Sequence, residues 1–230
     1  EGAAIMAGKS ALNFGTGLVT LVSKEKINND YELMQSRQLP ENITAIACGM
    51  GIGQSYDELE LLKLLTDKPA VIDADLFNMK IIKKILSHIK EAVLTPHPKE
   101  FASLLSILKL KEVSPAEVQE NRVNLALQFS SSYPNVVLYL KGANPIIAYK
   151  NKIYINDLGS SAMSKAGMGD VLTGLIGGLL AQNKDALTAT ISASLAHTIA
   201  ASRTLERCCS YAITPSKIIK EIGTFTNEEH

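Results

Sequence analysis

Residues 69–98 read PAVIDADLFNMKIIKKILSHIKEAVLTPHP and contain an apolar run, a helical pattern and a second apolar run. The runs at 69–73 and 92–94 are short and apolar, which is typical of buried strands. Between them, isoleucine and leucine recur at helical spacing from 77 to 89. A strand, a helix and a strand in succession predict a βαβ unit whose two strands lie parallel in one sheet.

The same alternation extends along the chain on both sides of this unit. Further strands are expected at 18–23, 43–48 and 135–140, with a hairpin formed by 145–149 and 152–156. Further helices are expected at 2–14, 59–65, 99–108, 115–131, from 170 onward, at 185–207 and after Thr214-Pro215. No linker or repeat interrupts the pattern, which predicts one α/β domain with a central, mostly parallel sheet.

Composition excludes several classes of protein. The 230 residues include 23 basic and 23 acidic side chains, so the excess positive charge expected for binding nucleic acid or an anionic membrane is absent. The longest apolar run, near 174–181, is too short to span a bilayer and contains glycines. The N-terminus lacks the pattern of a secretory signal. Three cysteines, two of them adjacent, favour a reducing compartment, and we expect a cytoplasmic protein.

Unusual residues follow each predicted parallel strand. They occur at 49–53, 73–75, 95–98 and 141–142, which are rich in glycine, proline and charged side chains. In parallel sheets, ligands bind at the carboxyl ends of the strands. These four loops therefore predict a single binding site at one edge of the sheet.

The segment Ala166-Gly167-Met168-Gly169-Asp170 precedes an apolar helix. Glycines allow backbone N–H groups to approach a phosphate closely, and the positive end of the helix points to the same place. Asp170 is then placed to accept a proton from a hydroxyl group that attacks a phosphoryl group. The alternative is an ordinary acid near a helix N-cap, with the glycines serving helix packing.

Two other side chains are candidates for binding. Lys141 follows a strand and could meet a phosphate as a point charge, or could be a surface lysine before a turn. His97 stands between Pro96 and Pro98, which stiffen its loop. It could bind a substrate or titrate near neutral pH, or simply pack in a proline-rich turn.

Two further features have weaker interpretations. The glycines at 49–53 lack the spacing of a dinucleotide-binding fingerprint, and indicate either close backbone approach to a ligand or a tight turn. Asp73 and Asp75 could hold Mg²⁺ through water, or could be solvated acids at a strand end. No cysteine and histidine cluster has the spacing of a zinc site.

Taken in order, these pieces resemble the NAD(P)H-hydrate dehydratases, the carbohydrate-kinase-related domain that is often fused to an NAD(P)H-hydrate epimerase domain. The resemblance covers essentially the whole chain, and residues 94–98 together with Gly167-Met168-Gly169-Asp170 make it specific. The matching segments are 2–4, 15–19, 48–51, 73–75, 94–101, 141–143, 166–170 and 172–174.

The resemblance implies a ribokinase-like, three-layer α/β/α fold and repair of damaged nicotinamide cofactor. The S-form of NADHX or NADPHX would be dehydrated at the expense of ADP or ATP with Mg²⁺, through phosphorylation of its hydroxyl group. A homo-oligomer, possibly a tetramer in this family, and a fused epimerase domain are also implied. The positions that match hydrate contacts are Ala3, Gly51, His97 and Asp170, and Asp170 matches the base. The positions that match nucleotide-binding segments are Lys141, Gly142, Ala143, Asn144, Pro145, Gly167 and Gly169.

Three departures from the family pattern stand out. Met168 replaces a common Thr or Ser, Ser160 replaces a common Asn, and Asn144-Pro145 follows Lys-Gly-Ala where Thr is usual. The family domain also begins with a strand and a glycine-rich loop before the helix at Gly2, so we expect these to be missing from residues 1–230. The alternatives are a vitamin-precursor kinase of the same superfamily and a catalytically idle nucleotide-binding remnant. Residues 94–100 favour the dehydratase over the kinase.

Overall fold

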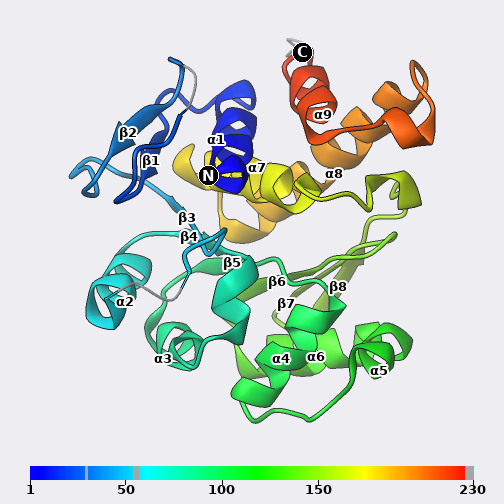
Figure 1. Cartoon of the computed structure of the whole chain (residues 1–230). Coiled ribbons are helices and arrows are strands. Elements are labelled where there is room, and N and C mark those ends of the chain that lie inside the picture. Colours follow the sequence, from blue (N-terminus) through cyan, green and yellow to red (C-terminus); the bar gives the residue numbers. More distant parts are fainter. Residues whose placement is uncertain (29–30, 54–56, 226–230) are drawn as a thin grey trace.

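A six-stranded sheet runs through the centre of the computed structural model, which describes residues 1–28, 31–53 and 57–225 (Figure 1). Its order is β3-β4-β5-β6-β7-β8, with β3 to β6 parallel and the hairpin of β7 and β8 antiparallel. The strands are β3 (Ile46–Cys48), β4 (Ala70–Ile72), β5 (Ala92–Leu94), β6 (Val136–Leu140), β7 (Ile146–Tyr149) and β8 (Lys152–Ile155). The predicted mostly parallel sheet is confirmed.

Helices cover both faces of this sheet, which gives three layers (Figure 1). One face carries α1 (Gly2–Asn13), α7 (Met168–Ala181), α8 (Ala186–Leu205) and α9 (Pro215–Ile222). The other carries α2 (Glu58–Asp67), α3 (Ile81–His88), α4 (Pro98–Ile107), α5 (Pro115–Glu120) and α6 (Arg122–Ser132). Within the described residues, no helix is both long enough and apolar enough to cross a membrane.

Alternate residues of each strand supply the two halves of the core. On β4, Ala70 and Ile72 pack with the helices of the α2–α6 layer, whereas Val71 packs with α7 and α8. Because successive side chains of a strand point to opposite faces, a strand between two helical layers must be apolar throughout. All five residues of β6 are accordingly buried.

The structure corrects several element boundaries. The helix predicted at 115–131 is two helices that meet at Asn121, whose φ of −119° and ψ of 29° break the helical path. The helix predicted from residue 77 begins at Ile81, after a 3₁₀ turn at Ala74–Asn78. A strand that the pattern did not predict, β2 (Met34–Ser36), pairs in parallel with β1 (Thr20–Val22) in a separate small sheet. Only Met34 of its three residues is apolar, so no apolar run marks it as a strand.

The other predicted features of the hairpin and caps are present. Lys150 and Asn151 have φ of 46° and 61°, the left-handed turn that joins β7 to β8. Ser114 caps α5 and Thr214 caps α9, each followed by proline in the first turn.

Gly174 sets the distance between α1 and α7. A Cβ atom at Gly174 would lie 2.0 Å from the Ala7 carbonyl oxygen, whereas one at Gly177 would lie 3.4 Å from a Val71 methyl carbon. We expect Gly174→Ala to lower the free energy of unfolding by about 2 kcal/mol or more, because α1 must move outward. Gly177→Ala is the matched control and should stay within about 1 kcal/mol of wild type, since it gains helix propensity. Urea denaturation of both variants is the measurement, and equal stabilities would contradict this packing.

Candidate active site

The carboxyl ends of the parallel strands are joined by backbone hydrogen bonds that extend the sheet into the loops. The Asp73 N–H donates to the Cys48 carbonyl at 2.9 Å, and the Lys141 N–H donates to the Pro96 carbonyl at 2.9 Å. The Thr95 N–H likewise donates to the Ile72 carbonyl at 3.1 Å. The loops after β3, β4, β5 and β6 therefore meet at one edge of the sheet, as predicted.

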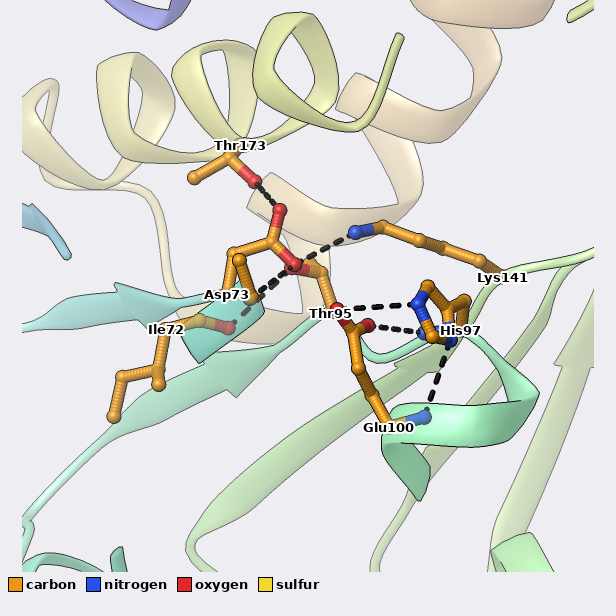
Figure 2. Close-up of polar contacts among 8 residues, drawn as sticks. Ile72, Asp73, Thr95, His97, Glu100, Lys141 and Thr173 are labelled. Carbon is orange, nitrogen blue, oxygen red and sulfur yellow. Dashed lines mark hydrogen bonds and ion pairs between the residues drawn. The ribbon is translucent and has the colours of Figure 1, made fainter. Parts of the chain in front are cut away.

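The carboxylate of Asp73 connects the end of β4 to the loop after β6 and to α7 (Figure 2). Its Oδ1 accepts a hydrogen bond from Lys141 Nζ at 2.6 Å, and its Oδ2 accepts one from Thr173 Oγ1 at 2.8 Å. The Ala74 N–H also donates to Oδ1, at 2.9 Å. One side chain at the end of β4 thus holds the loop after β6 and the second turn of α7.

The hypothesis that Asp73 is a solvated acid is wrong. The Asp73 residue is 2% exposed, and it forms an ion pair with a lysine whose side chain is 22% exposed. A buried carboxylate needs such hydrogen bonds and a partner of opposite charge. Asp75 points elsewhere, since its Oδ2 accepts the Gly53 N–H at 3.3 Å. Among the described residues, no group of three or more His, Cys, Asp or Glu side chains is placed to hold a metal.

Asp170 is the third residue of α7, because the helix begins at Met168 rather than at Asp170 as predicted. Burial raises the pKa of its carboxyl group, and the nearby negative charge of Asp73 raises it further, while Lys141 acts in the opposite direction. A carboxyl group with a raised pKa is a stronger proton acceptor when ionised, which suits a general base. The structure therefore places Asp170, a carboxyl group with a raised pKa, near the ammonium group of Lys141.

The glycines before Asp170 have separate physical reasons. Gly167 is the N-cap and has a φ of 90°, which strains any residue with a side chain. A Cβ at Gly169 would lie 3.0 Å from Lys141 Nζ, so the α7 backbone directly faces the ammonium group. Met168, by contrast, is 4% exposed and packs in the core between the sheet and α7 to α9. Its side chain therefore does not stand in the site.

His97 caps the N-terminus of α4. Its Nδ1 accepts the Glu100 N–H at 3.1 Å, and the Glu100 carboxylate accepts the His97 N–H at 2.8 Å, which is a reciprocal capping box (Figure 2). Because Nδ1 is an acceptor, a neutral His97 ring carries its proton on Nε2. The predicted fixing of His97 is confirmed, although the capping box supplies it together with Pro98. The side chain remains 48% exposed, and its Nε2 lies 3.3 Å from the Glu100 carboxylate.

The remaining predicted residues lie in the loops after β3 and β6 and in the first turn of α1. Gly142, Ala143 and Asn144 form an exposed loop, whereas Pro145 is buried at the start of β7. Gly51, with a φ of 74°, lies in the exposed loop after β3. Ala3 lies half-buried in the first turn of α1.

The structure adds Thr173 to the cluster. It lies three residues after Asp170 and so on the same face of α7, and it is fully buried against Asp73. The spacing alone could have suggested a shared face. A threonine in an apolar helix nevertheless gives no sign of which distant carboxylate it will bond.

The family model for NAD(P)H-hydrate dehydratase matches residues 1–224. This chain belongs to the NAD(P)H-hydrate dehydratase family. It is 42% identical over 226 residues to the bifunctional NAD(P)H-hydrate repair enzyme of Helicobacter pylori, covering 96% of this chain and 47% of that protein. The chain spans about half the length of the bifunctional relatives that it matches.

Solved structures share the fold. The ADP/ATP-dependent NAD(P)H-hydrate dehydratase of Bacillus subtilis, co-crystallised with ATP and Mg²⁺ and soaked with CoA, has a TM-score of 0.75 and 25% identity. That match covers 96% of this chain and 84% of the other. A ribokinase-like superfamily protein of Enterococcus faecalis has a TM-score of 0.71 and 22% identity, covering 97% and 81%. The ribokinase-like, three-layer fold predicted from the sequence is confirmed.

The Asp73 ion pair can be tested by stability. Asp73→Asn removes the charge that balances the partly buried Lys141, and we expect it to lower the free energy of unfolding by about 2–4 kcal/mol. Asp75→Asn, at an exposed loop contact, should change that free energy by no more than about 0.5 kcal/mol. Chemical denaturation of the two variants decides the matter. If Asp73→Asn lowered the free energy of unfolding no more than Asp75→Asn, the ion pair would not contribute to stability.

The pKa of Asp170 predicts an unusual dependence of stability on pH. A carboxyl group whose folded-state pKa is raised contributes stability at low pH that is lost as the pH rises through the folded value. Asp170→Asn should therefore be more stable than wild type at pH 7. This advantage should shrink to nothing below the ordinary carboxyl pKa of 3.8, where Asp170 is protonated in both states. Denaturation curves across this range measure it, and a gap independent of pH would contradict the raised pKa.

Proposed function

We propose that this chain is a single dehydratase domain that removes water from the S-form of NADHX or NADPHX and restores NADH or NADPH. ADP or ATP would drive the reaction by phosphorylating the hydroxyl group of the hydrate. The observation that supports this most strongly is the Asp170 carboxyl group, whose pKa is raised beside the Lys141 ammonium group at the head of α7. It occurs in a chain that the family model matches over residues 1–224.

The chemistry follows from the poor leaving-group character of hydroxide. The hydroxyl oxygen of the hydrate attacks the terminal phosphoryl group of the nucleotide, and the bond from phosphorus to the bridging oxygen breaks. Asp170 accepts the hydroxyl proton. This converts the hydroxyl group into a phosphate ester. The C–O bond of the ester then breaks and inorganic phosphate leaves, while loss of a proton from the neighbouring ring carbon restores the double bond of the nicotinamide ring. The overall products are NAD(P)H, phosphate and AMP or ADP.

Charge stabilisation by the chain supports the first step. Phosphoryl transfer depends on positioning and electrostatics more than on covalent catalysis by the protein. Lys141 Nζ lies against Gly169, so a phosphate bound at the start of α7 would meet both an ammonium group and the backbone N–H groups of the helix N-terminus. His97, fixed by its capping box, would contact the hydrate.

Magnesium fits this site as a companion of the nucleotide. Mg²⁺ is commonly held by one or two carboxylates, by waters and by the phosphates of its substrate. Asp170 is close enough to Asp73 to feel its charge, and as the less buried of the two it would contact such an ion through water. When bound, Mg²⁺ neutralises charge on the phosphates. The chain's own residues position the nucleotide and take the proton.

The surroundings of this domain are proposed from its relatives. The bifunctional name of the Helicobacter pylori relative, of which this chain matches about half, supports a fused epimerase domain in the whole protein. Both core clusters lie on opposite faces of the same sheet, which supports a single domain. A homo-oligomer and a cytoplasmic location complete the proposal.

Incubation of the full-length protein with S-NADHX and ADP or ATP tests the function, with restored NADH followed by absorbance. We expect restoration by wild type and a loss of at least about 100-fold in kcat for Asp170→Asn, since a positioned base contributes that much. Asp75→Asn is the matched carboxylate control and should retain activity. Absence of restoration together with phosphorylation of a vitamin precursor would favour the kinase alternative and contradict the proposal.

A further inference from the structure

Arg122 binds the backbone of residues 140–144, the segment that contains the predicted nucleotide-binding loop. It is the first residue of α6, and its guanidinium group donates to three carbonyl groups of the segment after β6. Nη1 donates to Asn144 O at 3.0 Å, and Nη2 donates to Leu140 O at 3.0 Å and to Lys141 O at 3.2 Å. A single side chain therefore spans both ends of residues 140–144.

The Gly142 backbone lies directly against the guanidinium end of Arg122. A Cβ at Gly142 would lie 2.5 Å from Nη2 and 2.8 Å from Cζ. Burial lowers the pKa of Arg122, and its buried Nε atom has no hydrogen-bond partner within the described residues. Burying a cation and leaving a donor unpaired both cost free energy. The three hydrogen bonds to carbonyl groups of residues 140–144 offset this cost, so the guanidinium group is held against this loop.

The carbonyl bonds also fix where the loop's N–H groups point. In a planar trans peptide the C=O and N–H groups point in opposite directions. The Lys141 carbonyl faces Arg122, so the Gly142 N–H in the same peptide unit points away from the guanidinium group, on the exposed side of the loop. An outward N–H in the peptide unit that follows Lys141 is a donor suited to an anionic oxygen.

We propose that Arg122 is a positioning residue that holds residues 141–144 in the conformation that receives the phosphates of ADP or ATP. It acts through the loop and does not touch the nucleotide, because both of its Nη atoms face carbonyl groups. This inference rests on the proposed function for the identity of the ligand. It adds a residue that lies outside the predicted site residues and is about twenty positions distant from the loop in sequence.

The pair of Arg122 and Gly142 offers a direct test by calorimetric measurement of ADP binding. Arg122→Lys keeps the charge but has a single ammonium group in place of a planar fork, so it cannot bridge the same carbonyl groups. We expect it to raise the Kd for ADP at least about tenfold. Gly142→Ala, which leaves Arg122 in place but displaces the guanidinium group, should raise the Kd similarly. The double variant should bind ADP no more weakly than either single variant, because the added methyl group then has nothing to collide with.

Two controls separate positioning from general destabilisation. Arg207→Lys, which alters the ion pair between an exposed arginine and the buried Glu221, should leave the Kd for ADP unchanged. In the dehydration assay, Arg122→Lys should raise the KM for the nucleotide while the KM for the hydrate stays within about twofold. A purely structural role would lower the thermal stability without this selective change.

The possible outcomes distinguish the two proposals. If wild type binds ADP and both single variants bind it equally well, the role of Arg122 is overturned while the proposed function stands. If the two substitutions weaken ADP binding additively, the direct contact between Arg122 and Gly142 is overturned as the cause. If wild type itself binds neither ADP nor ATP, the proposed function fails, and with it the identity of the ligand.

Discussion

A carboxylate can remain inside a protein only where other groups replace its lost hydration, and Asp73 meets this requirement with three donors from separate parts of the chain. Lys141 comes from the loop after β6, Thr173 from α7 and the Ala74 N–H from the following turn. The need to satisfy one buried charge therefore fixes the relative positions of a strand end, a loop and a helix. The candidate site lies at the edge of the sheet where these elements meet.

The electrostatics of Asp170 follow from that arrangement. Asp73 contributes a negative charge beneath the start of α7, and burial removes solvent from the same region, so the pKa of Asp170 rises. Lys141 is drawn to Asp73 and lies against the Gly169 backbone, where a side chain at position 169 would meet its ammonium group. The Asp170 carboxyl group and the Lys141 ammonium group are thus held close enough to interact electrostatically. Arg122 holds the loop after β6 as well, through hydrogen bonds to its carbonyl groups.

The sequence was sufficient for the fold because its strongest signals are periodic. Short apolar runs between amphipathic helices require a sheet buried on both faces, and the turn of Lys150 and Asn151 was predicted from their position between two strands. The break at Asn121 was missed because helix propensity is similar on both sides of it. The strand β2 was missed because it has a single apolar residue, Met34, and pairs only with the equally short β1.

The site was predicted in part, for a related reason. Glycines and charged residues at strand ends mark a binding edge, so Asp170, Lys141 and His97 could be named from their positions. The partners of Asp73 could not, since an ion pair across 68 positions and a hydrogen bond across 100 positions leave no local pattern. Arg122 looks like any surface arginine at a helix start until its three carbonyl acceptors are seen.

Amide hydrogen exchange, compared between wild type and Asp73→Asn, tests most directly whether one buried carboxylate holds these elements together. If it does, the loss of that charge should raise the exchange of residues 141–144 and of the first two turns of α7 together, while α9 keeps its protection. Increased exchange confined to the residues next to position 73, or none in the loop and α7, would contradict the account.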